Sequence, residues 1–168
     1  MISETKFQEI IKKINEAKTS GQMDLSTEED LSIAVMNLIS LEEHFFFTAE
    51  KTGKPEYFDM LKEVRSLRKE LLGKMIDRTE GETWCVSKHL LAASMRLLEV
   101  GTKLLGENGE SRKTEAEDFF HKAYKLYSLF WALKFKLISA GELKAETKSE
   151  GPMSVEDLVA KLVDCCKE

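Results

Sequence analysis

Glycine and proline are scarce in this sequence, with 9 and 2 occurrences in 168 residues. β-Sandwiches and barrels need many turns, and disordered chains are rich in residues that break helices, so both classes are disfavoured. Cysteine is also rarer than in a disulfide-stapled domain: there are 3, an odd number, and Cys165 and Cys166 are adjacent. We therefore expect reduced thiols, which are typical of a cytoplasmic protein.

Long hydrophobic runs and an excess of positive charge are missing as well. No apolar run approaches the roughly 18 to 20 residues that span a bilayer, and the first residues lack the apolar stretch of a signal peptide. With 25 Lys and Arg against 30 Asp and Glu, the formal net charge is −5, which gives no electrostatic reason to bind nucleic acid or anionic lipid. The sequence predicts a cytoplasmic protein without a membrane partner and argues against a nucleic-acid partner.

What the sequence does contain is long stretches of Leu, Ala, Glu and Lys with apolar residues at three- and four-residue steps. This spacing is typical of amphipathic helices, and the few glycines, prolines and polar clusters separate them. We predict an all-α fold: an antiparallel up-down four-helix bundle with short additional N- and C-terminal amphipathic helices. The helices are expected near residues 3–18, 27–51, 55–77, 80–105, 112–140 and 154–167.

The domain organisation follows from the same pattern. Residues 1–140 form a single helical-bundle domain, since a chain of this length builds one core; residues 141–153 form a polar linker, and residues 154–168 carry the last amphipathic helix. Neither short terminal helix is stable alone, so each must cover the bundle or pair with a partner chain. The run Phe45–Phe47 places aromatic side chains on more than one helical face. We therefore expect a protein that works by protein–protein association, as a homo-oligomer or with another protein.

A polar stripe runs along the helix expected at 80–105. Its members recur at three-, four- and seven-residue steps between two apolar stripes: Glu82, Cys85, His89, Arg96 and Glu99. Cys85 and His89 could bind one metal ion with Glu82 as a third ligand, and sulfur with imidazole favours zinc among the transition metals. The side chains that could complete the site from neighbouring helices are Glu42, His44, Asp118 and His121. Alternatively the stripe faces water, with Cys85 packed as a small apolar residue and His89 paired with a carboxylate.

Charged residues also fall on the apolar stripes of two earlier helices. Glu42 follows the apolar register of its helix, and Arg65 and Arg68 follow that of the next. Because charged side chains are rarely buried alone, we expect an interior ion pair between Glu42 and Arg68, which is favoured over a role for Glu42 as a metal ligand. Arg96 also needs a carboxylate. The candidate partners of Arg96 are Glu42, Glu99 and Glu63.

In its general arrangement of helices, this sequence resembles two families of helical bundles. Ferritin-like di-iron proteins need Glu-x-x-His on two helices; here Asp118 and His121 have that spacing with the shorter acid, and no Glu-x-x-His occurs. HEPN-type ribonuclease domains carry an arginine, a short polar spacer and a histidine, and the nearest stretch runs from Arg112 to His121. This second resemblance implies nucleotide or RNA handling, which we keep as an alternative function. No glycine-rich phosphate loop, nucleophile elbow, Cys-x-x-Cys or His-Glu-x-x-His motif is present, so whether the protein is an enzyme stays open.

Overall fold

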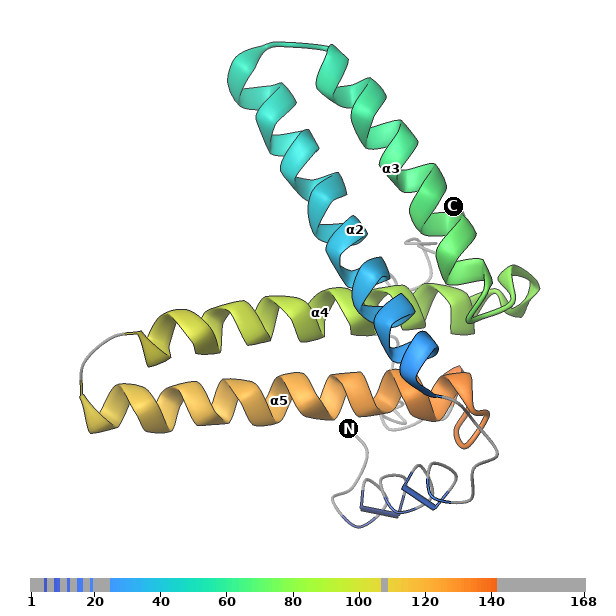
Figure 1. Cartoon of the computed structure of the whole chain (residues 1–168), viewed down its shortest axis with the longest axis vertical. Helices are drawn as coiled ribbons and strands as arrows, with labels where there is room; N and C mark the ends of the chain where they lie inside the picture. Colours follow the sequence, from blue (N-terminus) through green and yellow to red (C-terminus); the bar gives the residue numbers. More distant parts are fainter. Residues whose placement is uncertain are drawn as a thin grey trace, which may run out of the picture.

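The computed structural model describes residues 25–106 and 109–141, together with scattered residues between positions 5 and 19 that lie in helical turns. Within these residues all regular structure is helical, which confirms the predicted all-α class. Figure 1 shows the arrangement. The elements are the α-helices α2 (Leu25–Thr52), α3 (Glu56–Gly73), α4 (Glu82–Leu105) and α5 (Glu110–Lys134), and the short 3₁₀ helix η1 (Arg78–Glu80).

The helices pair into two antiparallel hairpins. α2 packs against α3 and α4 packs against α5 (Figure 1). The first hairpin turns at Gly53, which has a φ of 65°, a conformation that glycine adopts without strain. Pro55 directly precedes α3. Short turns between long amphipathic helices therefore give antiparallel neighbours, as the sequence predicts.

The two hairpins cross instead of lying side by side. The first half of α2 passes over α4 and α5, and the far ends of the hairpins point apart (Figure 1). Polar contacts join α2 to α5 at the crossing: the hydroxyls of Ser32 and Tyr127 lie 2.6 Å apart, and Lys134 pairs with Glu28 at 2.6 Å. The predicted up-down alignment of four helices is therefore not confirmed. The predicted helix at 154–167 lies outside the described residues.

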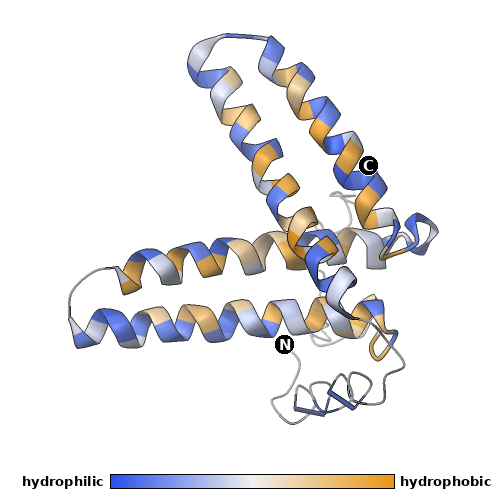
Figure 2. Cartoon of the chain, in the orientation of Figure 1, coloured by the Kyte–Doolittle hydropathy of each residue, from blue (hydrophilic) through white to orange (hydrophobic). Residues whose placement is uncertain are grey.

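The core lies where the hairpins cross. Its buried side chains come from all four helices and from the turn after α3: Val35, Met36, Leu72, Met75, Ile76, Trp84, Leu91, Phe130 and Trp131. Figure 2 shows apolar and polar residues alternating in stripes along each helix, which is the pattern of helices that bury one face. Burial is thus concentrated at one end of each hairpin.

The connection between the hairpins differs from the prediction. α3 ends at Gly73 and not near residue 77, and the chain then turns through η1. The carboxylate of Asp77 accepts hydrogen bonds from the backbone amide and the hydroxyl of Thr79, at 2.8 and 2.7 Å. These bonds, the backbone one first, hold the pKa of Asp77 below its usual value. Met75 and Ile76 are buried in the turn, so the apolar pattern continues past the end of the helix.

α5 also ends earlier than predicted, at Lys134 and not near residue 140. Lys136 adopts a left-handed backbone conformation with φ of 55°. Its amide donates to the carbonyl of Leu133, and the amide of Leu137 donates to the carbonyl of Ala132, both at 2.9 Å. These two bonds form a Schellman motif, which closes the helix. After the turn, Ile138 and Ala140 still pack on apolar residues of α5 in a second cluster, and this explains why periodicity alone overestimates the length of α5.

Replacing Lys136 with glycine should raise the free energy of unfolding by about 1 kcal/mol, because glycine adopts the left-handed conformation without the strain that a lysine carries. The ion pair of Lys136 with Glu80 is lost, but the lysine side chain is 78% exposed and such pairs contribute little. Urea denaturation of both proteins measures the difference. Lys136→Ala keeps the strained Cβ and should give no gain. A glycine variant less stable than the parent would contradict the assignment of this turn.

Candidate functional site

The crossing leaves a corner between the two hairpins, bounded by α2 on one side and by α4 and α5 on the other. One face of α2 borders it, through residues at three- and four-residue steps: Ile33, Met36, Ser40, Glu43 and Phe47. On α4, the consecutive residues Met95 and Arg96 also line the corner. Two hollows lie here, which we call the polar hollow and the apolar hollow.

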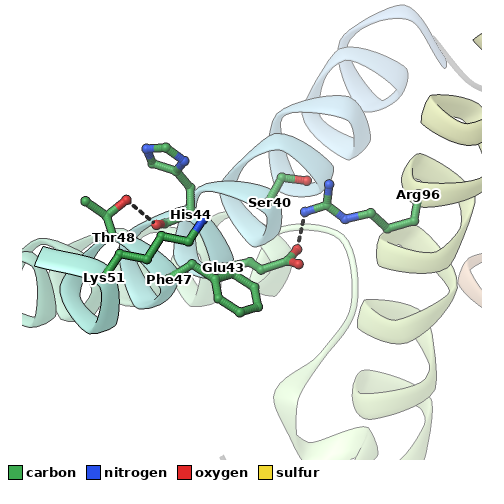
Figure 3. A pocket seen from close by; sticks show the side chains of 7 residues that line it. All are labelled: Ser40, Glu43, His44, Phe47, Thr48, Lys51 and Arg96. Carbon is green, nitrogen blue, oxygen red and sulfur yellow. Dashed lines mark hydrogen bonds and ion pairs between the residues drawn. The ribbon is translucent and has the colours of Figure 1, made fainter. Parts of the chain in front are cut away.

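The polar hollow has a volume of about 370 Å³ and lies between α2 and Arg96 of α4 (Figure 3). Its lining consists of Ser40, Glu43, His44, Phe47, Thr48, Lys51 and Arg96. Glu43 and Arg96 form an ion pair across it, and the hydroxyl of Thr48 donates to the carbonyl of His44 at 2.8 Å. Lys51 and Arg96 outnumber the single carboxylate. The hollow is therefore locally positive in a chain whose net charge is −5.

The partner of Arg96 corrects the sequence prediction. Arg96 pairs with Glu43, and not with the candidates Glu42, Glu99 or Glu63. Successive residues of an α-helix point about 100° apart. Glu42 pairs with Arg68 of α3, and its neighbour Glu43, on a different side of α2, reaches Arg96 of α4.

We expect Arg96→Ala to lower the free energy of unfolding by no more than about 1 kcal/mol. The side chains of Arg96 and Glu43 are 51% and 47% exposed, so water and salt screen their attraction. Urea denaturation at low and high salt measures the loss, and the difference between parent and variant should shrink as salt is added. A loss of about 3 kcal/mol or more, the value for a stranded buried charge, would contradict this description.

The predicted ion pair between Glu42 and Arg68 is confirmed. Nε of Arg68 donates to the Glu42 carboxylate at 2.8 Å, and its Nη2 donates to the other oxygen at 3.4 Å. The Arg68 side chain is 1% exposed and that of Glu42 13%. Arg65, the other arginine in register, lies 3.6 Å from the same carboxylate at the edge of the hairpin. Glu42 is thus committed to the packing of α2 on α3.

The apolar hollow has a volume of about 260 Å³ and is lined by three helices. α2 contributes Ile33 and Met36; the remaining lining residues are Ser94, Met95, Leu98, Phe120, Ala123, Tyr124 and Tyr127 from α4 and α5. Ile33, Leu98 and Tyr124 are 44%, 47% and 57% exposed. Large, exposed apolar side chains that line one concave surface are typical of a binding site.

Two of the polar side chains around the apolar hollow are hydrogen-bonded within the protein. The hydroxyl of Ser94 donates to the carbonyl of Leu90 at 2.8 Å, and the hydroxyl of Tyr127 shares a 2.6 Å hydrogen bond with Ser32. Burial raises the pKa of the Tyr127 phenol above its usual value, although the bond to Ser32 opposes this. Apart from the exposed Tyr124, the hollow therefore offers a ligand mainly apolar contact.

The predicted metal ligands are divided between environments. Cys85 is 1% exposed and packs in the core, as the alternative interpretation of the stripe proposed, whereas Glu82 is half-buried and His89 is exposed. Across the described residues, no group of three or more His, Cys, Asp or Glu side chains is placed to hold a metal ion. The zinc site at Glu82, Cys85 and His89 stays a prediction that the described geometry does not support.

The four residues proposed to complete the metal site do not gather around Cys85 either. Glu42 binds Arg68, His44 lines the polar hollow, and Asp118 pairs with Lys122 one turn along α5. His121 is exposed on α5. On the same helix Arg112 pairs with Glu115 at 2.9 Å, and the HEPN-like alternative stays a prediction.

Sequence reasoning missed the apolar hollow. Its lining residues come from three helices, and their convergence depends on the crossing of the hairpins. The sequence did hold one indication of it. The helix at 80–105 carries two apolar stripes, and one neighbouring helix cannot cover both.

No protein-family model, curated protein or solved structure matches this chain. None of the helices in the described part of the chain is long and apolar enough to cross a membrane. The predicted cytoplasmic location stays a prediction.

Proposed function

We propose that this protein acts by association, and that its apolar hollow receives the apolar face of an amphipathic helix from a partner chain. The observation that carries the proposal is the convergence of exposed apolar side chains from three helices. Ile33, Leu98 and Tyr124 are each about half exposed around a hollow of about 260 Å³. Covering them would remove apolar surface from water, at roughly 25 cal/mol for each Å².

The shape and the chemistry of the corner suit a helix. A helical ligand inserts side chains at three- and four-residue steps into a groove between helices, and the corner offers α2 as one wall and the α4–α5 pair as the other. Met36 and Met95 are adaptable side chains that can repack around a ligand, and Tyr124 is the kind of exposed aromatic residue that becomes an interface anchor. Both features support protein binding.

Site-specific photo-crosslinking tests this proposal. The photoreactive residue p-benzoylphenylalanine is placed at Tyr124, in the hollow, or at Phe58 on α3, which is 43% exposed and does not line the hollow. After irradiation we expect Tyr124 to capture a second polypeptide, a partner protein or another copy of this chain, and Phe58 to capture none. Leu98→Lys should abolish the capture, because it places a charge in the apolar contact. Equal capture from both positions, or none from Tyr124, would contradict the proposal.

A further inference from the structure

We infer that the apolar hollow is occupied, when no partner is bound, by the C-terminal segment of the same chain, residues 154–168. The inference rests on the proposed function, because it names a competitor that regulates the same surface. A partner helix would then bind by displacing this segment. Three features carry the inference: the apolar pattern of the segment, the length of chain that connects it, and its charge.

The pattern matches what the hollow receives. Apolar residues of the segment recur at three- and four-residue steps: Val155, Leu158, Val159, Leu162 and Val163. This pattern predicts a helix with one apolar stripe, and 15 residues make a helix about 22 Å long. A helix of that length is not stable alone in water. It needs an apolar surface of the kind that Leu98 and Tyr124 leave exposed.

The connecting chain is long enough to bring the segment back. Ile138 and Ala140 are buried in a second apolar cluster with Leu129 and Leu133 of α5, so the chain leaves the folded body beside the C-terminal end of α5. The hollow begins on α5 at Tyr127 and extends to Phe120, which lie about 10 and 21 Å before Lys134 at 1.5 Å for each residue. Residues 142–153 span up to about 40 Å when extended. The segment can therefore run back along α5 over the hollow.

Charge favours the same placement. The segment holds four acidic residues and two lysines. The polar hollow, which carries Lys51 and Arg96 against one carboxylate, directly adjoins the apolar one: Met95 lines the apolar hollow, and the next residue, Arg96, lines the polar one. A helix whose apolar stripe fills the apolar hollow would bring its acidic residues near these cations.

Paramagnetic NMR on the full chain tests the inference. A nitroxide label is attached at position 168 in a Glu168→Cys chain that also carries Cys165→Ala and Cys166→Ala; Cys85 is kept because it is buried. The amide signals of Leu98 and Tyr124 should lose intensity on labelling, whereas that of Phe58 on α3 should not. The loss should persist on tenfold dilution, as expected for contact within one chain.

Matched variants show whether the apolar stripe makes the contact. Leu158→Glu with Leu162→Glu should restore the intensity at Leu98 and Tyr124. Ala160→Glu introduces the same residue beside the stripe, not within it, and should leave the loss unchanged. The inference is overturned if labelling causes no loss at the hollow, if both variants behave alike, or if the loss disappears on dilution, which would assign the contact to a second copy.

Combining the label with the crosslinker separates the two proposals. Where both hold, Leu158→Glu with Leu162→Glu raises the capture of a second polypeptide at Tyr124. Intensity loss at the hollow without any capture of a second polypeptide supports the intramolecular contact and contradicts the proposed function. Capture that the double variant leaves unchanged, together with no intensity loss, supports the proposed function and overturns this inference.

Discussion

Glu42→Ala is expected to lower the free energy of unfolding by about 3 to 5 kcal/mol. The substitution leaves the guanidinium of Arg68 in a site that is 1% exposed, without the carboxylate that accepts its hydrogen bonds at 2.8 and 3.4 Å. Arginine does not lose its proton in proteins, so the charge remains. It either stays buried without that carboxylate, or it reaches water only when α2 and α3 separate. Urea denaturation gives the size of the loss.

The next residue along the chain provides the control. Glu43→Ala removes an acid from the same helix, but its partner Arg96 is 51% exposed, and the loss should stay within about 1 kcal/mol. The double variant Glu42→Leu with Arg68→Met removes both buried charges and should recover most of the stability that Glu42→Ala loses. If Glu42→Ala and Glu43→Ala have equal effects, the Glu42–Arg68 pair is not interior.

Gly101→Ala is expected to lower the free energy of unfolding by about 1 to 2 kcal/mol, although alanine favours a helix over glycine by about 1 kcal/mol. α4 and α5 approach closely at this residue. A Cβ on Gly101 would lie 2.5 Å from the ring of Phe120 and 3.2 Å from the backbone carbonyl of Ala116. The ring and α5 must both shift to admit it. Thermal denaturation measures the loss.

Gly73 is a matched control for Gly101. It also lies near the C-terminal end of its helix, and a Cβ there would meet nothing nearer than the Trp84 ring at 4.0 Å. Gly73→Ala should leave stability unchanged or raise it by up to about 1 kcal/mol. If both alanine variants are stabilised equally, α4 and α5 do not pack as closely as described. Because Phe120 also lines the apolar hollow, Gly101→Ala should in addition weaken the crosslinking at Tyr124.

Local features of the sequence predicted much of the fold. The helices at 27–51 and 80–105 are found within two residues of their predicted bounds, because apolar periodicity and turn residues act over short stretches of chain. The pairing of Glu42 with Arg68 was predictable for the same reason. Two charged residues in the apolar registers of consecutive helices meet when a short turn makes those helices antiparallel.

The arrangement of the two hairpins was not predictable in this way. Apolar stripes show that α2 and α4 need neighbours, but the angle between packed helices depends on how their side chains interdigitate. The partner of Arg96 and the lining of the apolar hollow both depend on that angle. The ends of α3 and α5 were missed because buried residues such as Met75 continue the apolar pattern through turns.

The most direct test of this account is the separation between the far ends of α2 and α4, since the corner exists only if they diverge beyond the Glu43–Arg96 pair. Spin labels at Thr52 and Lys103, both exposed, report this separation by pulsed electron paramagnetic resonance in a chain with Cys165→Ala and Cys166→Ala. If the hairpins cross as described, the distance is far beyond the roughly 8 to 10 Å between the axes of packed helices. A short distance, as between helices packed side by side in an up-down bundle, would show that there is no corner between the hairpins and would contradict the proposed binding surface.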